Sequence, residues 1–326
     1  MEMTNHSNQY YSCIDVVKVV MAIFVVAIHT QPELCLQSDW ARFLLSKLFN
    51  VAVPFFFVTS GFLLWNKMDG LSLSGKLARV ESWLKRVLLL YVVWSIIYLP
   101  YAVYGFKHDG VNVSTAVVVY LRNFCLVGEN FWSWNLWYLL ALVVSGCLIW
   151  ISLKCGLEKR GLAFLACGLL FVGHLISAFG NSEVSTLYYR VFKTLRNGFF
   201  EGFPYMVVGI LISGHKILPK WILTVLFLCS IALYFDGFRI ALIVVIWSFF
   251  SILIQMRVNI NHNISTCLRL SSKVIYLTHM LWFGLLSLTV NLNPCMFFVA
   301  VLALSIGCSM IATLNRDTEM VRLLFA

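Results

Sequence analysis

The residues best suited to chemistry in this chain lie in its first apolar run, residues 14–30, which contains Asp15, Lys18 and His29. A charged or titratable side chain at membrane depth costs several kcal/mol unless it faces protein or water. On a helix, the eleven steps from Lys18 to His29 turn through about 1,100°, so both side chains share one face, about 16 Å apart along the axis. We therefore predict that this face points inward, onto a wet chamber that opens to the cytosol.

Imidazole is the usual general base near neutral pH, so His29 is our candidate for removing a proton from a hydroxyl group. Asp15 and Lys18 are three residues apart and can pair across one helical turn. The alternative is structural. Asp15 and Lys18 then form a salt bridge at the cytoplasmic interface, with the lysine extended toward water, and His29 is a hydrated residue at the outer interface.

The composition identifies the elements that must position these groups. Of 326 residues, 61% are hydrophobic and only 12% are charged, with a mean hydropathy of +0.87. Soluble domains average about 25% charged residues, so we predict an all-α polytopic membrane bundle of about ten transmembrane helices. Windows of about 20 apolar residues give the expected spans 14–31, 48–65, 86–105, 134–153, 161–179, 199–213, 220–235, 238–256, 273–290 and 294–314.

The net charge of +10 follows from membrane topology rather than from binding to nucleic acid. With the N-terminus inside, the cytoplasmic segments carry fifteen Lys and Arg residues and the outer segments carry eight. This bias follows the positive-inside rule and predicts a multi-pass protein of the plasma membrane with both termini in the cytoplasm. We expect a polar cytoplasmic tail at 1–12, a transmembrane domain at 13–315 and a short cytoplasmic tail at 316–326.

The ten cysteines are scattered singly, without a Cys-x-x-Cys pair or a Cys/His cluster at metal-binding spacing. We therefore expect no metal site, and thiols that behave mostly as small apolar side chains. Cys35 and Cys125 fall in predicted outer loops, and a disulfide between them is the alternative.

Four further groups of residues could line the chamber. In the second span, Pro54 interrupts the hydrogen-bond ladder, and Ser60 with its neighbours provides either a packing motif or hydroxyl groups for a ligand. In the ninth span, His279 lies six residues beyond Lys273, about 9 Å from the inner face. It is either a buried, satisfied histidine or a functional one.

The fourth span opens with Trp137 and Tyr138, which could present aromatic faces to a ligand or belong to an interfacial belt. Arg196 and Glu201 enter the sixth span from the outer side, where a polar pair suits an acceptor substrate.

Together these residues resemble the acyltransferase family 3 of integral membrane proteins. Asp15-x-x-Lys18 followed by His29 is similar to the family's first-helix signature, and Lys85-Arg86 is similar to its basic entrance to the third helix. The remaining similar segments follow in the family's order: 53–64 in the second helix, 135–139 in the fourth, and 275–279 late in the chain.

The resemblance implies a ten-helix bundle that moves an acyl group, usually acetyl, from a cytoplasmic coenzyme A thioester to a hydroxyl of an envelope or saccharide acceptor. His29 would be the catalytic base, with Lys18 and Asp15 in the same motif. We assign Lys85, Arg86, Ser60, Tyr276 and His279 to the acyl-CoA donor, which is a substrate rather than a resident cofactor. We assign Trp137, Tyr138, Arg196 and Glu201 to the acceptor.

Two departures from the family pattern concern the donor and acceptor. Many members have a second Arg at the position of Leu89, and many carry a fused extracytoplasmic domain that we do not find in this sequence.

A related pattern occurs in the membrane half of vancomycin-resistance-type serine/alanine racemases. In that alternative the chain takes up an amino acid or anchors a racemase partner, and Lys18, His29 and Glu201 line a path for a zwitterion. A third possibility, a structural partner within the membrane, leaves the titratable first helix unexplained.

Overall fold

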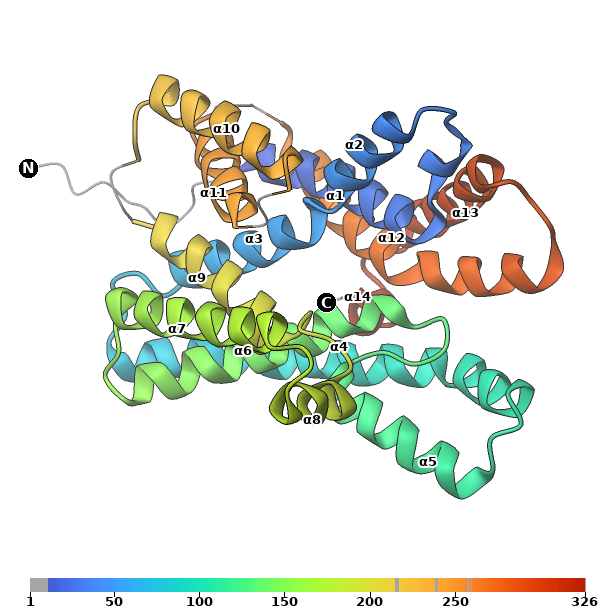
Figure 1. Ribbon diagram of the computed structural model, residues 1–326. Helices are drawn as coiled ribbons and strands as arrows, with labels where there is room; N and C mark the ends of the chain where they lie inside the picture. Colours follow the sequence, from blue (N-terminus) through green and yellow to red (C-terminus); the bar gives the residue numbers. More distant parts are fainter. Residues whose placement is uncertain (1–10, 215–216, 238–239, 257, 259, 326) are drawn as a thin grey trace, which may run out of the picture.

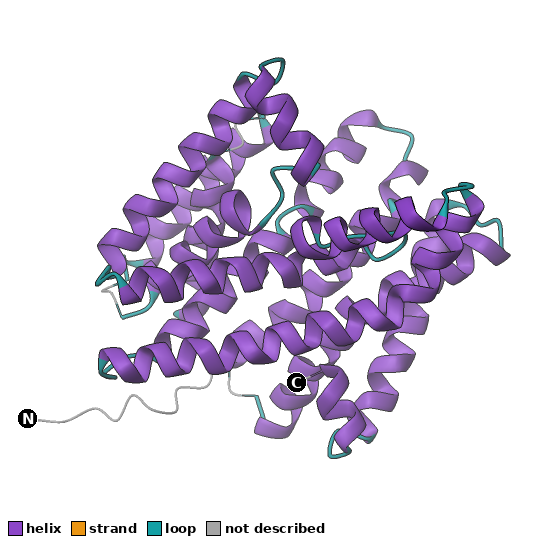
Figure 2. Ribbon diagram, turned by 90° about the horizontal axis from the view of Figure 1, so that it is seen from below, coloured by secondary structure: helices purple, strands orange, loops and turns teal. Residues whose placement is uncertain are grey.

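The computed structural model describes residues 11–214, 217–237, 240–256, 258 and 260–325, and this part of the chain is helical with no strand (Figure 2). The α-helices are α1 Ser12–Thr30, α2 Asp39–Phe49, α3 Ala52–Asn66, α4 Leu73–His108, α5 Val113–Arg122, α6 Trp137–Lys154, α7 Lys159–Ala178, α8 Glu183–Phe192, α9 Phe203–Ile212, α10 Lys220–Phe235, α11 Ala241–Ile254, α12 His262–Thr289, α13 Pro294–Leu314 and α14 Glu319–Phe325. The shorter turns are η2 Pro32–Cys35, η3 Asn123–Val127, η4 Trp134–Leu136 and η5 Gly198–Gly202.

Each predicted span lies largely on a helix, and the predicted all-α polytopic bundle is confirmed. Six helices or helix pairs among the described residues are long and apolar enough to cross a membrane, the longest being Leu73–His108. Shorter apolar helices cover the predicted sixth to eighth spans, and α12 contains the ninth. The start of the eighth span, residues 238–239, lies outside the described residues, as does most of the expected N-terminal tail, residues 1–10.

Helices also occur between the predicted spans. Helix α4 begins at Leu73, within the connection between the second and third predicted spans, and there the Ser72 hydroxyl accepts a hydrogen bond from the Gly75 amide. The outer connections contain α5 and α8, which begin after the capping residues Asn112 and Ser182. A cap satisfies amide groups that the first turn leaves unpaired. A search for apolar windows of about 20 residues misses these two helices because α5 is apolar but only 10 residues long and α8 has a mixed composition.

The helices pack as two groups joined by α9. In Figure 1, α4, α6 and α7 lie below α1, α3 and α12, and α9 contacts both α3 and α7. The crossing of α3 and α9 is very close. A Cβ atom on Gly61 would lie 2.0 Å from the Met206 carbonyl oxygen, and one on Gly209 would lie 2.0 Å from that of Val58. Small residues that let helix backbones approach are typical of membrane bundles.

Within the second predicted span, different residues make the packing contact and the polar contact. Gly61 serves the packing, as the structural interpretation predicted, while Ser60 faces α6. The expectation for Pro54 was wrong in detail. The chain breaks earlier, between α2 and α3, so Pro54 falls in the first turn of α3, where amide groups have no intrahelical partner.

The C-terminal segment is folded rather than extended as a tail. Helix α14 packs against α4 and α12 (Figure 1). The Phe325 side chain is buried. The Trp94 indole donates to the Leu324 carbonyl at 2.8 Å, and the Lys273 ammonium donates to the Phe325 carbonyl at 3.0 Å. These bonds fix the last helical turn, whose carbonyl groups would otherwise be unpaired.

Candidate functional site

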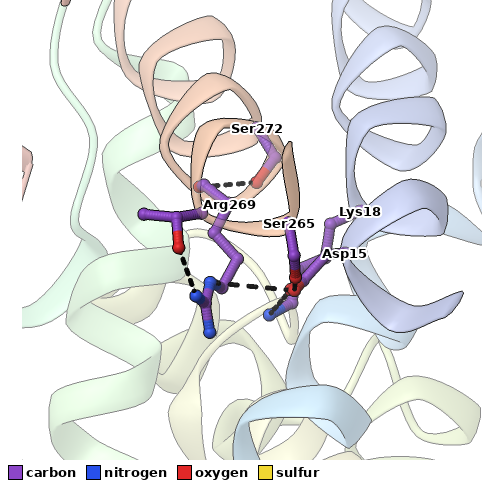
Figure 3. A network of polar contacts seen from close by, with 6 residues as sticks. Asp15, Lys18, Ser265, Arg269 and Ser272 are labelled. Carbon is purple, nitrogen blue, oxygen red and sulfur yellow. Dashed lines mark hydrogen bonds and ion pairs between the residues drawn. The ribbon is translucent and has the colours of Figure 1, made fainter. Parts of the chain in front are cut away.

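A compact ionic network joins one end of α1 to α12 (Figure 3). The buried Asp15 carboxylate lies 3.7 Å from the Lys18 ammonium and 3.7 Å from the Arg269 guanidinium. It also accepts a hydrogen bond from the Ser265 hydroxyl. The predicted pair of Asp15 and Lys18 is confirmed, whereas Arg269 and Ser265 were not predicted as partners. Their four-residue spacing, which puts both on one face of a helix, was the available signal.

Further cations surround this network. Four positive side chains repel one another electrostatically: Lys18, Lys67, Arg269 and Lys273. The positive charge of Arg86 also repels Lys67 and Lys273. Burial lowers the pKa of Lys67, and the nearby Arg86, Arg79 and Arg269 lower it further. One carboxylate, Asp15, offsets charge within the network that Figure 3 shows. The cluster defined by Lys18, Lys67, Arg79, Arg86, Arg269 and Lys273, called the cation cluster below, therefore favours an anion.

Of the two basic residues predicted at the start of the third span, the structure brings only one to this cluster. Arg86 is within electrostatic reach of Lys67 and Lys273. Lys85 instead points to the exposed side of α4, where its ammonium pairs with Glu81 at 2.8 Å. Successive helical residues lie about 100° apart, so both cannot face the same way.

His29 faces a second imidazole across the same pair of helices. The ring centroids of His29 and His279 are 5.3 Å apart. Two contacts join α1 to α12: Asp15 with Ser265, and His29 with His279. The partners in both contacts are 250 positions apart in the sequence, so the two helices run parallel in a constant register. Lys18 and His29 thus both face α12, as the helical spacing predicted. Whether a hydrated chamber lies beside them remains a prediction.

His279 is fully buried, and only one of its two ring nitrogens has a hydrogen-bond partner among the described residues. Its Nδ1 lies 3.2 Å from the Ile275 carbonyl oxygen, which can only accept, so Nδ1 carries the proton and Nε2 is an acceptor. Nε2 is buried without a hydrogen-bond partner among the described residues. Helix α12 begins at His262, eleven residues before Lys273, so the predicted ninth span covers only its later part, and the parallel register with α1 fixes where His279 lies along α1. His279 therefore lies level with His29, away from the cation cluster.

Aromatic side chains enclose the imidazole pair. The Trp134 ring stacks 6.1 Å from His29, and the Tyr276 ring lies 6.0 Å from His279. Tyr138 packs 5.5 Å from Tyr276, and its hydroxyl contacts the Ser60 hydroxyl at 3.3 Å. Four residues predicted in three different spans thus form one continuous wall: Ser60, Tyr138, Tyr276 and His279. It consists of rings and hydroxyl groups next to His29.

Asn135 positions this wall, a role that the sequence did not reveal. Its side-chain amide donates to the Tyr276 carbonyl at 3.1 Å, and the Tyr276 hydroxyl donates back to the Asn135 carbonyl. The Tyr98 hydroxyl from α4 donates to the adjacent Leu277 carbonyl at 2.7 Å. These bonds join α4, η4 and α12, and they leave Asn135 Oδ1 buried without a partner among the described residues.

Arg196 and Glu201 lie on the other side of the wall. The Arg196 guanidinium stacks over the Trp137 ring at 5.0 Å and lies 3.8 Å from the Glu201 carboxylate. Its charge also reaches His29 and Tyr276. Trp137 is buried, so it contributes to the interior and not to an interfacial belt. Of the predicted acceptor residues, Tyr138 therefore belongs to the wall, while Arg196 joins Trp137 to Glu201.

Loops beside Arg196 add further charge. Burial raises the pKa of the Glu129 carboxyl, although Lys193 and Arg196 favour its charged form. Burial also lowers the pKa of Lys193. Within the described residues no three His, Cys, Asp or Glu side chains come together as metal ligands.

The fold and this polar interior define a multi-pass helical membrane protein with titratable groups facing one another inside the bundle. Residues 11–314 match the family model described as an acyltransferase domain, and the chain belongs to this family. The predicted resemblance is thereby confirmed at the level of the family.

Curated relatives carry different names. A serine/alanine racemase from Enterococcus gallinarum is 29% identical over 70% of this chain and 34% of its own length. An amino-acid racemase from Enterococcus faecalis is 30% identical over 58% of this chain and 24% of its own length. The aligned part of this chain spans about a third or less of these relatives. No solved structure matches the chain.

Proposed function

We propose that this protein is an integral membrane acyltransferase of the plasma membrane, which moves an acyl group from a cytoplasmic acyl-CoA to a hydroxyl acceptor of the cell envelope. The acyl group we favour is acetyl, and the acceptor class we favour is a saccharide. The observation that carries the proposal is the pairing of His29 with His279 on the same two helices whose other ends hold the cation cluster. Membership of the acyltransferase family supports the reaction type.

The separation of the two ends suits the donor. Lys18 and His29 are eleven residues apart on α1, about 16 Å along the helix axis. In coenzyme A a long pantetheine arm separates the charged phosphates from the thioester. The cation cluster would hold the phosphates through charge-assisted bonds, and the arm would extend along α1 and α12. The thioester carbonyl would then stand next to His29.

The reaction that follows is direct transfer. One ring nitrogen of His29 removes the proton of the acceptor hydroxyl group. At the same time, the oxygen of that hydroxyl group attacks the carbonyl carbon of the thioester. Donor groups in the wall, such as the hydroxyls of Ser60 and Tyr138, would stabilise the resulting oxyanion. The intermediate then collapses, the carbon–sulfur bond breaks, and the CoA thiolate takes the proton from His29. His279 Nε2, an acceptor, would orient the His29 ring.

The experiment that tests the proposal uses membranes containing the full chain and radiolabelled acetyl-CoA. We expect His29→Ala to reduce label transfer to membrane material by at least about 100-fold, the usual contribution of a general base. The matched control is His108→Ala, which removes an exposed imidazole at the end of α4. Equal transfer by His29→Ala and wild type, at equal levels of folded protein, would contradict the assignment of the base.

The names of the relatives favour a second candidate, an amino-acid uptake or anchoring domain that works with a racemase. The paired Arg196 and Glu201 could bind the carboxylate and ammonium of a zwitterion. Proteoliposomes with radiolabelled L-serine separate the two functions. Serine uptake that is lost in both Arg196→Gln and Glu201→Gln, without any transfer from acetyl-CoA, would favour the second candidate.

A further inference from the structure

Two cysteines that are 260 positions apart in the sequence meet in the structure. Cys35 ends the short turn η2, which follows α1, and Cys295 is the second residue of α13. The Cys295 amide donates to the Cys35 sulfur at 3.1 Å, and the Cys295 thiol donates to the Pro32 carbonyl at 3.5 Å. The Cys35 thiol also lies 4.0 Å from the side-chain oxygen of Asn293, the residue that caps α13. Both side chains therefore lie between the same two segments, and both residues are exposed.

This contact differs from the pairing that the sequence left open. Cys125, the other cysteine of that pairing, lies in η3 and interacts electrostatically with Tyr91 of α4. Cys295 was assigned to the start of a span, so it was not considered as a loop cysteine. A disulfide needs Cβ atoms about 3.8 Å apart. The Cys35 sulfur lies 3.1 Å from the Cys295 amide nitrogen, which is one bond from the Cys295 Cα atom, so the two side chains begin next to each other.

The location of the pair favours oxidation. Helices α1 and α12 run parallel, so the turn after α1 and the turn after α12 lie at the same end of the bundle. The positive-inside orientation places that end outside the cytoplasm, where disulfides persist. We propose that Cys35 and Cys295 form a disulfide on the outer face, a covalent link between η2 and the start of α13.

The chemistry is thiol–disulfide exchange with an oxidant that itself carries a disulfide. The Cys35 thiolate attacks one sulfur of the oxidant, breaks its sulfur–sulfur bond and forms a mixed disulfide. The Cys295 thiolate then attacks the Cys35 sulfur and releases the oxidant as a dithiol. The two cysteines lose two electrons to the oxidant, and their two protons end on the released thiols.

The link would hold the outer end of α1 against α13, and α13 packs along α12. His29 lies six residues before Cys35 and faces His279 of α12. The disulfide would therefore restrict separation of the two helices that carry the imidazole pair. This inference depends on the orientation of the chain and not on the proposed acyl transfer.

The test counts reactive thiols in the full chain. Membranes are treated with oxidised glutathione, the protein is denatured, and a maleimide of high mass labels every free cysteine. With ten cysteines in the sequence, we expect eight labels in wild type before reduction and ten after reduction with dithiothreitol. Cys125→Ser, the matched control, should show seven before reduction and nine after it. Cys35→Ser and Cys295→Ser should each show nine in both conditions.

Other outcomes overturn the proposal. Ten labels in oxidised wild type show that no link forms. Seven labels in oxidised Cys295→Ser, together with nine in Cys125→Ser, show that Cys35 pairs with Cys125 instead. As an independent reading, dithiothreitol should lower the melting temperature of oxidised wild type by about 5 °C or more. The same treatment should leave Cys35→Ser unchanged.

Discussion

Replacement of Asp15 by Asn tests whether the cation cluster acts as one electrostatic unit. Asn is nearly isosteric and keeps an oxygen that accepts from Ser265, but it removes the charge that offsets Lys18 and Arg269. The two effects of the change have opposite directions. The free protein should become less stable, because its cations repel one another without compensation. Binding of a polyanion should become stronger, because the variant presents a larger positive charge.

The magnitude follows from the distances. Two unit charges 3.7 Å apart attract by about 4 kcal/mol at an effective dielectric constant of 20. The desolvation of both partners offsets much of this gain, and the Arg269 side chain is 38% exposed, so its pair is also weakened by solvent screening. We expect a net loss of about 2 to 4 kcal/mol. For a chain of this length that corresponds to a melting temperature lower by about 3 to 6 °C.

The assay is thermal unfolding of purified protein in detergent, with and without coenzyme A. Asp39→Asn is the control, because Asp39 forms an ion pair with Arg42 at the same three-residue spacing but is 94% exposed. We expect no measurable change for this control. The coenzyme A affinity of Asp15→Asn should rise by about threefold at low salt, an effect that salt screens.

Two results would refute this reasoning. A melting temperature of Asp15→Asn equal to that of Asp39→Asn would show that the carboxylate does not hold the network together. A lower affinity for coenzyme A would show that Asp15, rather than the cations, contacts the ligand.

Two further predictions concern packing and pH. Gly209→Ala should lower the melting temperature by several degrees, because the added Cβ atom would lie 2.0 Å from the Val58 carbonyl oxygen. The control Gly168→Ala has open space around the added atom and should be neutral or slightly stabilising. Equal melting temperatures of the two variants would contradict the close crossing of α3 and α9. Coenzyme A binding, measured by calorimetry, should weaken as the pH rises toward 10.5, because the pKa of Lys67 is lowered by burial and by Arg86, Arg79 and Arg269, so this lysine loses its charge before a free lysine would. Lys67→Arg should weaken less than wild type over the same range, since the other lysines of the cation cluster remain. A decline as steep as that of wild type would exclude Lys67 as a contributor.

Much of the fold follows from the sequence because the membrane imposes a simple rule. A segment of about 20 apolar residues must satisfy its backbone hydrogen bonds internally, so it becomes a helix whatever its neighbours are. The spans therefore correspond to helices, including the short ones at 199–213 and 220–235. Helices α5, α8 and α14 escaped this rule because each is much shorter than a span, and their signals are capping residues and contacts with other helices.

Part of the candidate site was also predictable. Helical spacing alone placed Lys18 and His29 on one face of α1, and it paired Asp15 with Lys18. It could not show that Lys85 turns away from the cation cluster, because that depends on which face of α4 packs inward. Nor could it identify Asn135 as the residue that joins η4 to α12.

The sequence by itself determined the class of protein, the long apolar helices and the side chains available for chemistry, since all of these depend on composition and on spacing along one helix. The tertiary structure decided which of those side chains meet. The parallel register of α1 and α12 brings His29 to His279, Asp15 to Arg269, and Cys35 to the start of α13. Such contacts join residues about 250 positions apart and depend on how whole helices pack, which no local pattern encodes.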